Sequence, residues 1–233
     1  QSGRRQRQMC IRDRFISPLY ANDIYVTQSG DDLDLDITQD GQNNVAGTSQ
    51  TAIGLTGDTM TFSISQVGNS NVVSTIINGD TYTGNINLTG SSNNVALLCS
   101  SGGAGNCETV SMSIDVTGSS ADIDVTIGNS AAATNYVGTI DITSTNDETF
   151  TLTANAANAD ADIDITNNAQ GSSVGNTANY TQTGAGDSAG HSLTHSHTGE
   201  GATIDVTQTG IYDNKIQMTT SGDDADIDIS QSD

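Results

Sequence analysis

From residue 22 onward, aliphatic and polar residues alternate along most of the chain. Ile, Val or Leu occupies every second position in short segments such as LDLDIT (33–38), IDVT (114–117) and DIDIT (162–166). Strict alternation of this kind is typical of a β-strand with one buried side and one side facing solvent. Gly, Asn, Ser and Asp fill many of the intervals between the segments, as tight turns require. The pattern therefore predicts an all-β protein.

The alternating segments are copies of one unit, an aliphatic–polar–aliphatic triplet followed in most copies by Thr or Ser. A single strand–turn–strand unit cannot bury its apolar face alone, whereas stacked units share a continuous core. We therefore expect a β-solenoid of roughly eight or nine coils, about 40 Å tall at ~4.8 Å per coil. A β-sandwich would account for the strands but not for the repeated units. The second aliphatic residue of the triplet recurs at positions 37, 64, 88, 116, 142, 165, 206 and 229.

Several units continue into a motif of amides and small residues. The segment ITQDGQNNVAGTSQ (37–50) places Gln39, Gly41, Asn44, Ala46 and Gln50 at the spacing Q-x-G-x-x-N-x-A-x-x-x-Q. An amide repeated at one place of each coil can form a hydrogen-bonded ladder, and glycine permits a tight turn or a close backbone approach. We expect these residues to hold the stack together. Looser copies of the motif contain Gln28, Gln66, Gly68, Asn71, Gln182, Gly184, Gln208, Gly210 and Gln231.

This spacing resembles the curlin repeat of curli, the secreted bacterial amyloid fibres. The match is closest at residues 39–50 and weakens in the middle of the chain, where Gln gives way to Gly, Ser or Asn. The resemblance implies a secreted, self-assembling structural subunit of an extracellular fibre or biofilm matrix at the cell surface. It also implies that the partner is a second copy of the chain, together with an outer-membrane secretion channel and a nucleator.

The charge distribution limits the partners further. The net charge is −22, and five of the six basic residues lie within the first 14 positions. Beyond them, Lys215 is the only basic residue against 27 acidic ones (28 less Asp13). Such a surface repels phosphate backbones and anionic lipid, so nucleic-acid binding and membrane-surface binding are not expected. Membrane insertion is not expected either, because no stretch reaches the ~20 apolar residues that span a bilayer.

Residues 1–21 differ in composition from the rest of the chain. The basic run contains MCIRDR (9–14), which resembles the translation of a sequencing adapter. FISPLYA (15–21) then resembles the end of a secretory signal peptide. A nucleic-acid-binding arm is the alternative interpretation of the basic run. We expect residues 1–21 to be a leader and residues 22–233 to form one curlin-like repeat domain.

An acidic residue often lies between the two aliphatic residues of a unit. If the coils stack in register, these carboxylates form one outward-facing column in which neighbours ~4.8 Å apart repel each other. The column is either a solubilising face or a binding site for Ca²⁺ through oxygen ligands. Ca²⁺ is a weak candidate, since the GGxGxD calcium repeat is absent, and no other cofactor is expected. The candidate ligands are Asp36, Asp115, Asp141, Asp164, Asp205 and Asp228.

Few other residues suggest chemistry. Cys99 and Cys107 flank a Gly-rich insertion and are candidates for a loop-closing disulfide in a secreted protein. HSLTHSH (191–197) holds three histidines, for which we expect a solvated polar strand in preference to a transition-metal site. No nucleophile elbow, phosphate loop or Cys–His pair outside the leader indicates catalysis, so we do not expect an enzyme.

Self-assembly has one alternative, a monomeric acidic β-solenoid that acts as a binding module. Such a module would be an adhesin segment or an ice- or glycan-binding domain, cation-dependent or not, and it would need a flat outer face of regular Thr or aromatic residues. TFTLT (149–153) is a candidate for part of such a face. Self-assembly is favoured because IYVTQSG (24–30) in one copy can continue IDISQ (227–231) in another by head-to-tail β-augmentation.

Overall fold

The structure is a computed structural model, and the residues it describes form strands and turns. No helix long and apolar enough to cross a membrane occurs among them. For residues 7–14, 22, 23 and 167 the backbone alone is described. The described residues are 7–14, 22–47, 53–68, 70–90, 92–99, 107–118, 120–128, 133–167, 176–184, 191–210 and 214–232.

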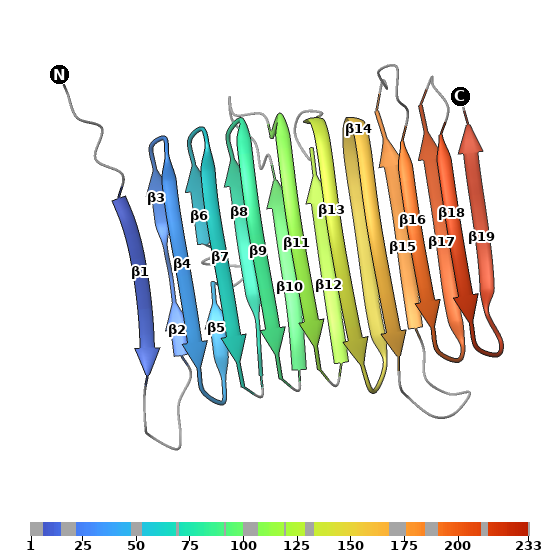
Figure 1. The fold of residues 1–233 in the computed structure, drawn as a ribbon, viewed down its shortest axis with the longest axis horizontal. Helices are drawn as coiled ribbons and strands as arrows, with labels where there is room; N and C mark the ends of the chain where they lie inside the picture. The colour runs from blue at the N-terminus through green and yellow to red at the C-terminus, as the bar shows by residue number, and fades with distance from the viewer. Residues whose placement is uncertain are drawn as a thin grey trace.

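The strands form two parallel sheets, called sheet A and sheet B here, and follow one another in chain order along the long axis (Figure 1). Sheet A contains β1 (Arg7–Arg14), β4 (Leu33–Asp40), β7 (Met60–Val67), β9 (Thr81–Thr89), β11 (Thr109–Thr117), β13 (Ala133–Ser144), the second part of β14 (Glu148–Asn167), β16 (Ser192–Thr198) and β18 (Lys215–Ser221). Sheet B contains β2 (Asn22–Ile24), β3 (Thr27–Ser29), β5 (Asn44–Ala46), β6 (Ile53–Thr56), β8 (Val73–Asn78), β10 (Ser92–Cys99), β12 (Ser120–Ile127), the first part of β14, β15 (Asn176–Thr183), β17 (Ala202–Thr209) and β19 (Asp226–Ser232).

The chain alternates between the two sheets, so that each coil contributes to both. β14 makes this crossing within one strand, since residues 148–155 pair with β15 in sheet B and residues 156–167 pair with β13 in sheet A. This architecture confirms the predicted fold class, an all-β β-solenoid, and the strand pairing shows that successive coils are parallel. Residues 7–14, part of the expected leader, pair with β4 as β1. Pairing does not reveal processing, so the leader stays a prediction.

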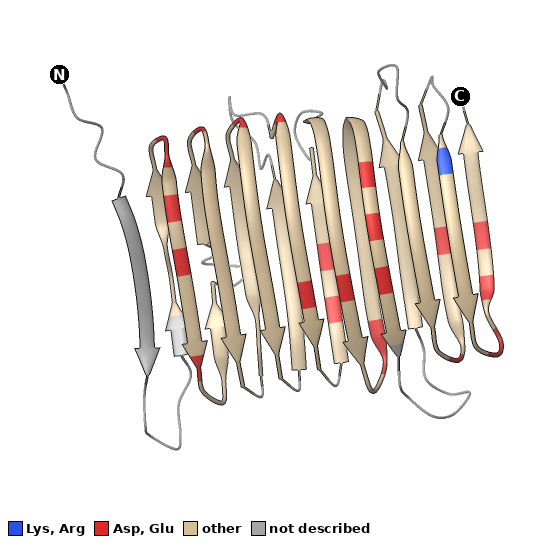
Figure 2. Cartoon of the chain, viewed as in Figure 1, with Lys and Arg blue, Asp and Glu red and all other residues tan. Residues whose placement is uncertain are grey.

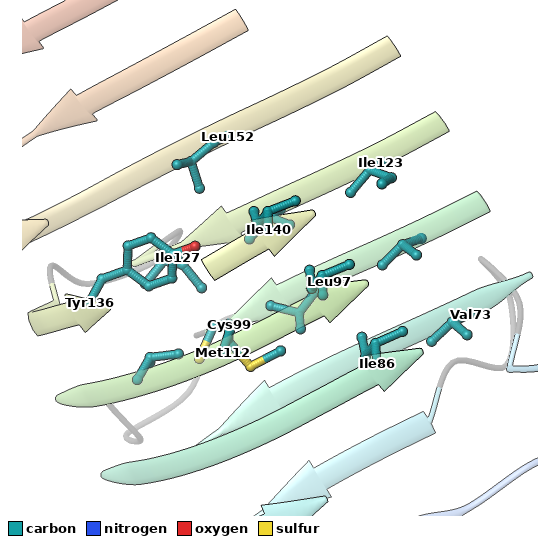
Figure 3. Packing of buried hydrophobic residues seen from close by; sticks show 14 of the residues in the cluster. Val73, Ile86, Leu97, Cys99, Met112, Ile123, Ile127, Tyr136, Ile140 and Leu152 are labelled. Atoms are coloured by element: carbon teal, nitrogen blue, oxygen red, sulfur yellow. The ribbon is translucent and has the colours of Figure 1, made fainter. Parts of the chain in front are cut away.

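The core is a narrow layer between the sheets. Along β9 and β17 buried and exposed residues alternate strictly, and the buried members are mostly aliphatic. Figure 3 shows such side chains from both sheets, among them Ile86, Leu97 and Ile123, pointing into the space between the ribbons. Aromatic residues need smaller residues beside them in so thin a layer. Gly84 lies beside Phe62 in sheet A, where a Cβ atom would come within 2.4 Å of the ring.

The register differs from the expected one in two places. Ile64 pairs with Ile86 and not with Leu88, which lies beside Gln66. Val206 and Ile229 pair with each other in sheet B, whereas the corresponding residues of the earlier units lie in sheet A. The reason is that only 15 residues separate Ile165 in sheet A from Tyr180 in sheet B, which is half a coil. The aliphatic–polar–aliphatic triplet therefore occurs in strands of both sheets.

Candidate functional site

The motif that begins at Gln39 forms a buried corner at the N-terminal end of the stack. Gln39 and Gln66 lie side by side in sheet A, and Gln66 Nε2 donates a hydrogen bond to Gln39 Oε1. Each amide also donates to a backbone carbonyl six residues on, at 2.9 Å from Gln39 to Val45 O and at 3.2 Å from Gln66 to Val72 O. The ladder thus ties each strand of sheet A to the strand that follows it in sheet B.

Asparagines and glycines complete this corner. Asn71 Nδ2 donates to Asn44 Oδ1 at 3.0 Å, and Asn93 Nδ2 donates to Asn71 Oδ1 at 2.7 Å. All three asparagines are buried. A Cβ atom at Gly68 would lie 1.5 Å from the carbonyl oxygen of Gly41, so only glycine allows the coils to approach this closely.

A second ladder forms at the C-terminal end, in sheet B. Gln208 donates to Gln182 Oε1, and Gln231 Nε2 donates to Gln208 Oε1 at 2.9 Å. In both amide–amide bonds, the glutamine donates to the glutamine of the preceding coil. Gln208 also donates to Lys215 O at 3.2 Å, which repeats the strand-to-strand bond of the first ladder. Amide ladders were expected, but as one set, and the structure divides them between two sheets.

The other motif residues lie in varied settings. Ala46 is fully buried beside Val73, as a thin core requires. Gly184 approaches the Ala156 carbonyl, where a Cβ atom would lie at 1.9 Å, whereas a Cβ atom at Gly210 would lie 3.3 Å from the His191 ring. Gln28 is half-buried, and its amide makes a 3.5 Å contact to the adjacent Ser29 carbonyl. Gln50 lies outside the described residues.

The C-terminal end of the stack is an open edge on both sheets. In the described chain β18 pairs only with β16, and β19 pairs only with β17, so one side of each strand has no pairing strand. The inward-facing Ile227 and Ile229 of β19 are 38% and 49% exposed, although their columns are buried in the preceding coils. Among the described residues, this end therefore displays exposed isoleucines of the core columns together with backbone groups that no described strand pairs.

The acidic residues are spread over both sheets (Figure 2), so the expectation of a single column is wrong. Asp115, Asp141 and Asp164 form a column on the outer face of sheet A, and Asp205 and Asp228 form a pair in sheet B. Asp36 lies in sheet A on a different column, beside Ser63. No group of three or more side chains placed to hold a metal ion occurs in the described part of the chain.

Electrostatics within the sheet A column match its geometry. The pKa of Asp141 is raised by burial first and then by the neighbouring carboxylates Asp115 and Asp164. Repulsion between the stacked carboxylates therefore disfavours the ionised form of Asp141. Of the described side chains coloured in Figure 2, Lys215 on β18 is the one basic residue, so the column gains little local compensation.

The three histidines are buried, which corrects the expectation of a solvated strand. His191, His195 and His197 are 1–2% exposed and face the core with Leu193, which lies on the same side of β16. Opposite them, at the start of β14, lies Glu148, which is 2% exposed. The sequence contained a signal for this cluster, since the alternation of HSLTHSH puts its histidines on the face of an apolar leucine.

The cluster, defined as Ser144, Glu148, Tyr180, His195 and His197, is partly hydrogen-bonded. The Ser144 hydroxyl donates to Glu148 Oε2, and the other carboxylate oxygen lies 4.0 Å from His197 Nδ1. Tyr180 Oη is 3.0 Å from His195 Nδ1, and the two rings contact each other. Sequence reasoning did not find Ser144, Glu148 or Tyr180. Glu148 meets His197 from another coil, Tyr180 meets His195 across the two sheets, and Ser144 contacts Glu148 across the turn between β13 and β14.

Burial sets the protonation of this cluster. It raises the pKa of Glu148 to about 7, against a smaller lowering by the Ser144 hydrogen bond. It lowers the pKa of His195 to about 4, with His197 lowering it further, and also lowers the pKa of His197. The cluster therefore favours neutral imidazoles and a protonated carboxyl. All five side chains are at most 2% exposed, so we interpret the cluster as part of the packed core.

Cys99 and Cys107 form a disulfide with a Cα–Cα distance of 6.0 Å, and both are fully buried. Cys99 ends β10, and Cys107 lies two residues before β11, with its sulfur 3.7 Å from the Ile77 carbonyl. The bond joins the two ends of the insertion within the core.

No family model, curated protein or solved structure matches the chain.

Proposed function

We propose that the protein is a secreted, self-assembling structural subunit of an extracellular curli-like fibre or biofilm matrix. In this proposal the stack has roughly eight or nine coils, and copies polymerise head to tail by β-augmentation. The observation that carries the proposal is the open edge of β18 and β19, with Ile227 and Ile229 exposed on it. A second copy is the simplest source of a strand to pair with this edge, because its coils have the same spacing of inward-facing apolar residues.

The physical drive for assembly comes from this edge. An unpaired parallel strand presents N–H and C=O groups that another strand can satisfy, and the incoming coil would also cover the exposed isoleucines. Because one end of the stack binds the other end, the contact is heterologous and does not close on itself. Repetition of such a contact gives a filament.

The remaining parts of the proposal follow from this role. A disulfide fits an oxidising compartment, and the acidic surface keeps separate fibres apart. The expected partners are further copies of the chain, an outer-membrane secretion channel and a nucleator. Neither catalysis nor a cofactor is part of the proposal, and Ca²⁺ would act only on the carboxylates of the outer faces.

Electron microscopy and a thioflavin-type dye after dilution from denaturant test the proposal. Wild-type chain should form dye-positive fibres, and Ile229→Lys should prevent growth because it puts a charge into the junction core. Ser230→Lys is the matched control, since it adds the same charge to the same strand on the outward face. A wild-type chain that stays monomeric, or an Ile229→Lys variant that grows normally, would refute the proposal.

A second candidate is a monomeric binding module for ice or a glycan. The outer face of sheet B favours it, because threonines repeat there from coil to coil at ~4.8 Å. A stable monomer that shows thermal hysteresis or retains a glycan would favour this candidate over the fibre. The columns are Thr149–Thr177–Thr203 and Thr153–Thr181–Thr207.

A further inference from the structure

Three inward-facing columns of sheet B run from one end of the stack to the other. The first begins at Ile24 and ends at Ile227. The column two residues on begins at Val26, beside Ile53, and ends at Ile229. A third begins at Gln28, passes through apolar residues from Leu55 to Ala154, and ends at Gln231.

The two ends of sheet B therefore carry nearly the same sequence at the same positions. IYVTQS (24–29) lies at one end and IDISQS (227–232) at the other. Aligned in register, isoleucine meets isoleucine, valine meets isoleucine, and glutamine meets glutamine. On the outer face a threonine meets a serine and a serine meets a serine, so Tyr25 and Asp228 are the one dissimilar pair.

Resting on the proposed function, we propose that the partner of the C-terminal edge is the N-terminal coil of a second copy, docked in this one register. β19 of one copy pairs in parallel with β2 and β3 of the next copy, so that Ile24, Val26 and Gln28 continue the three columns. The apolar surface covered on docking belongs mainly to β19, since Ile24 and Val26 are already 8% and 7% exposed while Ile227 and Ile229 are far more open.

The amide ladder gives the junction its direction. Gln231 donates to Gln208, which donates to Gln182, so Gln231 Oε1 is the last acceptor in the series. The incoming Gln28 Nε2 would donate to that oxygen and extend the ladder in the same sense. Within the described part of the single chain, the Gln28 amide makes one long local contact, at 3.5 Å, so little is lost when it turns to the new acceptor.

The same ladder excludes other registers. A slip by one residue would turn every inward side chain outward. A slip by two residues would place Gln231 against Val26 or beyond Gln28, which leaves a buried amide without its partner at a cost comparable to a lost hydrogen bond. A single polar position in an apolar column fixes register in this way in coiled coils.

Cysteine cross-linking between copies tests the register. Tyr25 and Asp228 are exposed and would lie opposite each other on the outer face, at a strand spacing of ~4.8 Å that falls within the Cα range of a disulfide. Full-length Tyr25→Cys and Asp228→Cys chains, each with Cys10→Ser, are mixed, assembled and oxidised. A matched mixture replaces Asp228→Cys by Ser230→Cys, which reports a slip of two residues.

The expected result is at least tenfold more cross-linked dimer in fibres of the first mixture than in fibres of the second. Fibres that cross-link through Ser230→Cys, or through neither pair, overturn the register and leave the proposed function standing. Failure of the wild-type chain to form fibres overturns both. As a further measurement, Gln28→Leu should slow elongation of wild-type seeds by up to about tenfold, whereas an unchanged rate would contradict the role of the ladder.

Discussion

The buried carboxyl and imidazoles predict two opposing effects of pH on stability. Between pH 6.5 and about 4, unfolded His195 binds a proton that folded His195 does not, because burial lowers its pKa to about 4. Stability contributed by His195 is therefore present above pH 6.5 and is lost as the pH falls. A change of 2.5 pH units in pKa corresponds to ~3 kcal/mol of unfolding free energy.

Glu148 acts in the opposite direction. Its pKa is raised from 4.5 to about 7, chiefly by burial, so the folded state keeps a proton that the unfolded state has released. Its contribution is present below pH 4.5 and is lost as the pH rises toward 7, again by ~3 kcal/mol. In the wild type these two terms offset each other. Acid also removes stability through His191 and His197, whose pKa values burial lowers, and adds stability through Asp124 and Asp141, whose pKa values burial raises.

Single substitutions should separate the two terms. Glu148→Gln removes the carboxyl, so between pH 7 and pH 4 this variant should lose ~3 kcal/mol more stability than the wild type. His195→Met copies its column neighbour Met218, and it should lose ~3 kcal/mol less. Together the two variants bracket the wild-type dependence on pH.

Urea unfolding at pH 7.5, 6.5, 5.5 and 4.5 measures these slopes. The Ile229→Lys background is suitable, because it should keep the chain monomeric. Asp224→Asn, in the exposed turn between β18 and β19, is the control for loss of one acidic group. If Glu148→Gln has the same slope as the background, Glu148 ionises alike in both states and burial does not raise its pKa.

Three further predictions follow from packing and charge. Gly84→Ala should cost about 1–3 kcal/mol of unfolding free energy, because the new Cβ would press on Phe62, whereas Gly54→Ala, with its nearest atom at 3.9 Å, should cost much less; equal urea midpoints would contradict this. Gln208→Leu should cost about 1–3 kcal/mol by the same measurement, because it leaves buried partners of its amide unsatisfied; a cost near zero would show that the ladder is not needed for stability. Asp141→Asn should raise the melting temperature at low salt, and this gain should shrink as salt is added. If the column binds cations, Ca²⁺ should stabilise the wild type more than the variant. Melting temperatures that do not respond to Ca²⁺ or EDTA would remove the cation hypothesis.

Much of the fold could be predicted from local pattern. Alternation identified the strands and their inward faces, and the recurring unit identified the stack, because both depend on residues close together in sequence. The pairs Gln39–Gln66 and Gln208–Gln231 lie beside each other as their shared spacing suggested. The position of the disulfide likewise followed from two cysteines at the ends of one insertion.

The division of the repeated units between two sheets was not predicted. Alternation determines which side of a strand is buried, but not which sheet the strand joins. IDVTQ (204–208) and LDITQ (35–39) read alike and lie in different sheets. The buried cluster was missed for a related reason, since Glu148 meets His197 only after the chain has crossed between the sheets and back again.

The placement of the amides suggests why this protein keeps buried polar groups at all. The buried ladders of Gln or Asn occupy the first coils and the last coils, and a half-buried Asn135–Asn158 pair lies between them. The column between Gln28 and Gln182 is apolar, passing through Leu55, Ile77 and Ala154. Within the chain, connecting turns already fix the register, so aliphatic columns suffice there. At a junction between copies no covalent connection fixes it, and aliphatic columns alone tolerate a slip of two residues. An amide that must meet an amide supplies the missing constraint, so the ends of the stack are where buried glutamine is most useful.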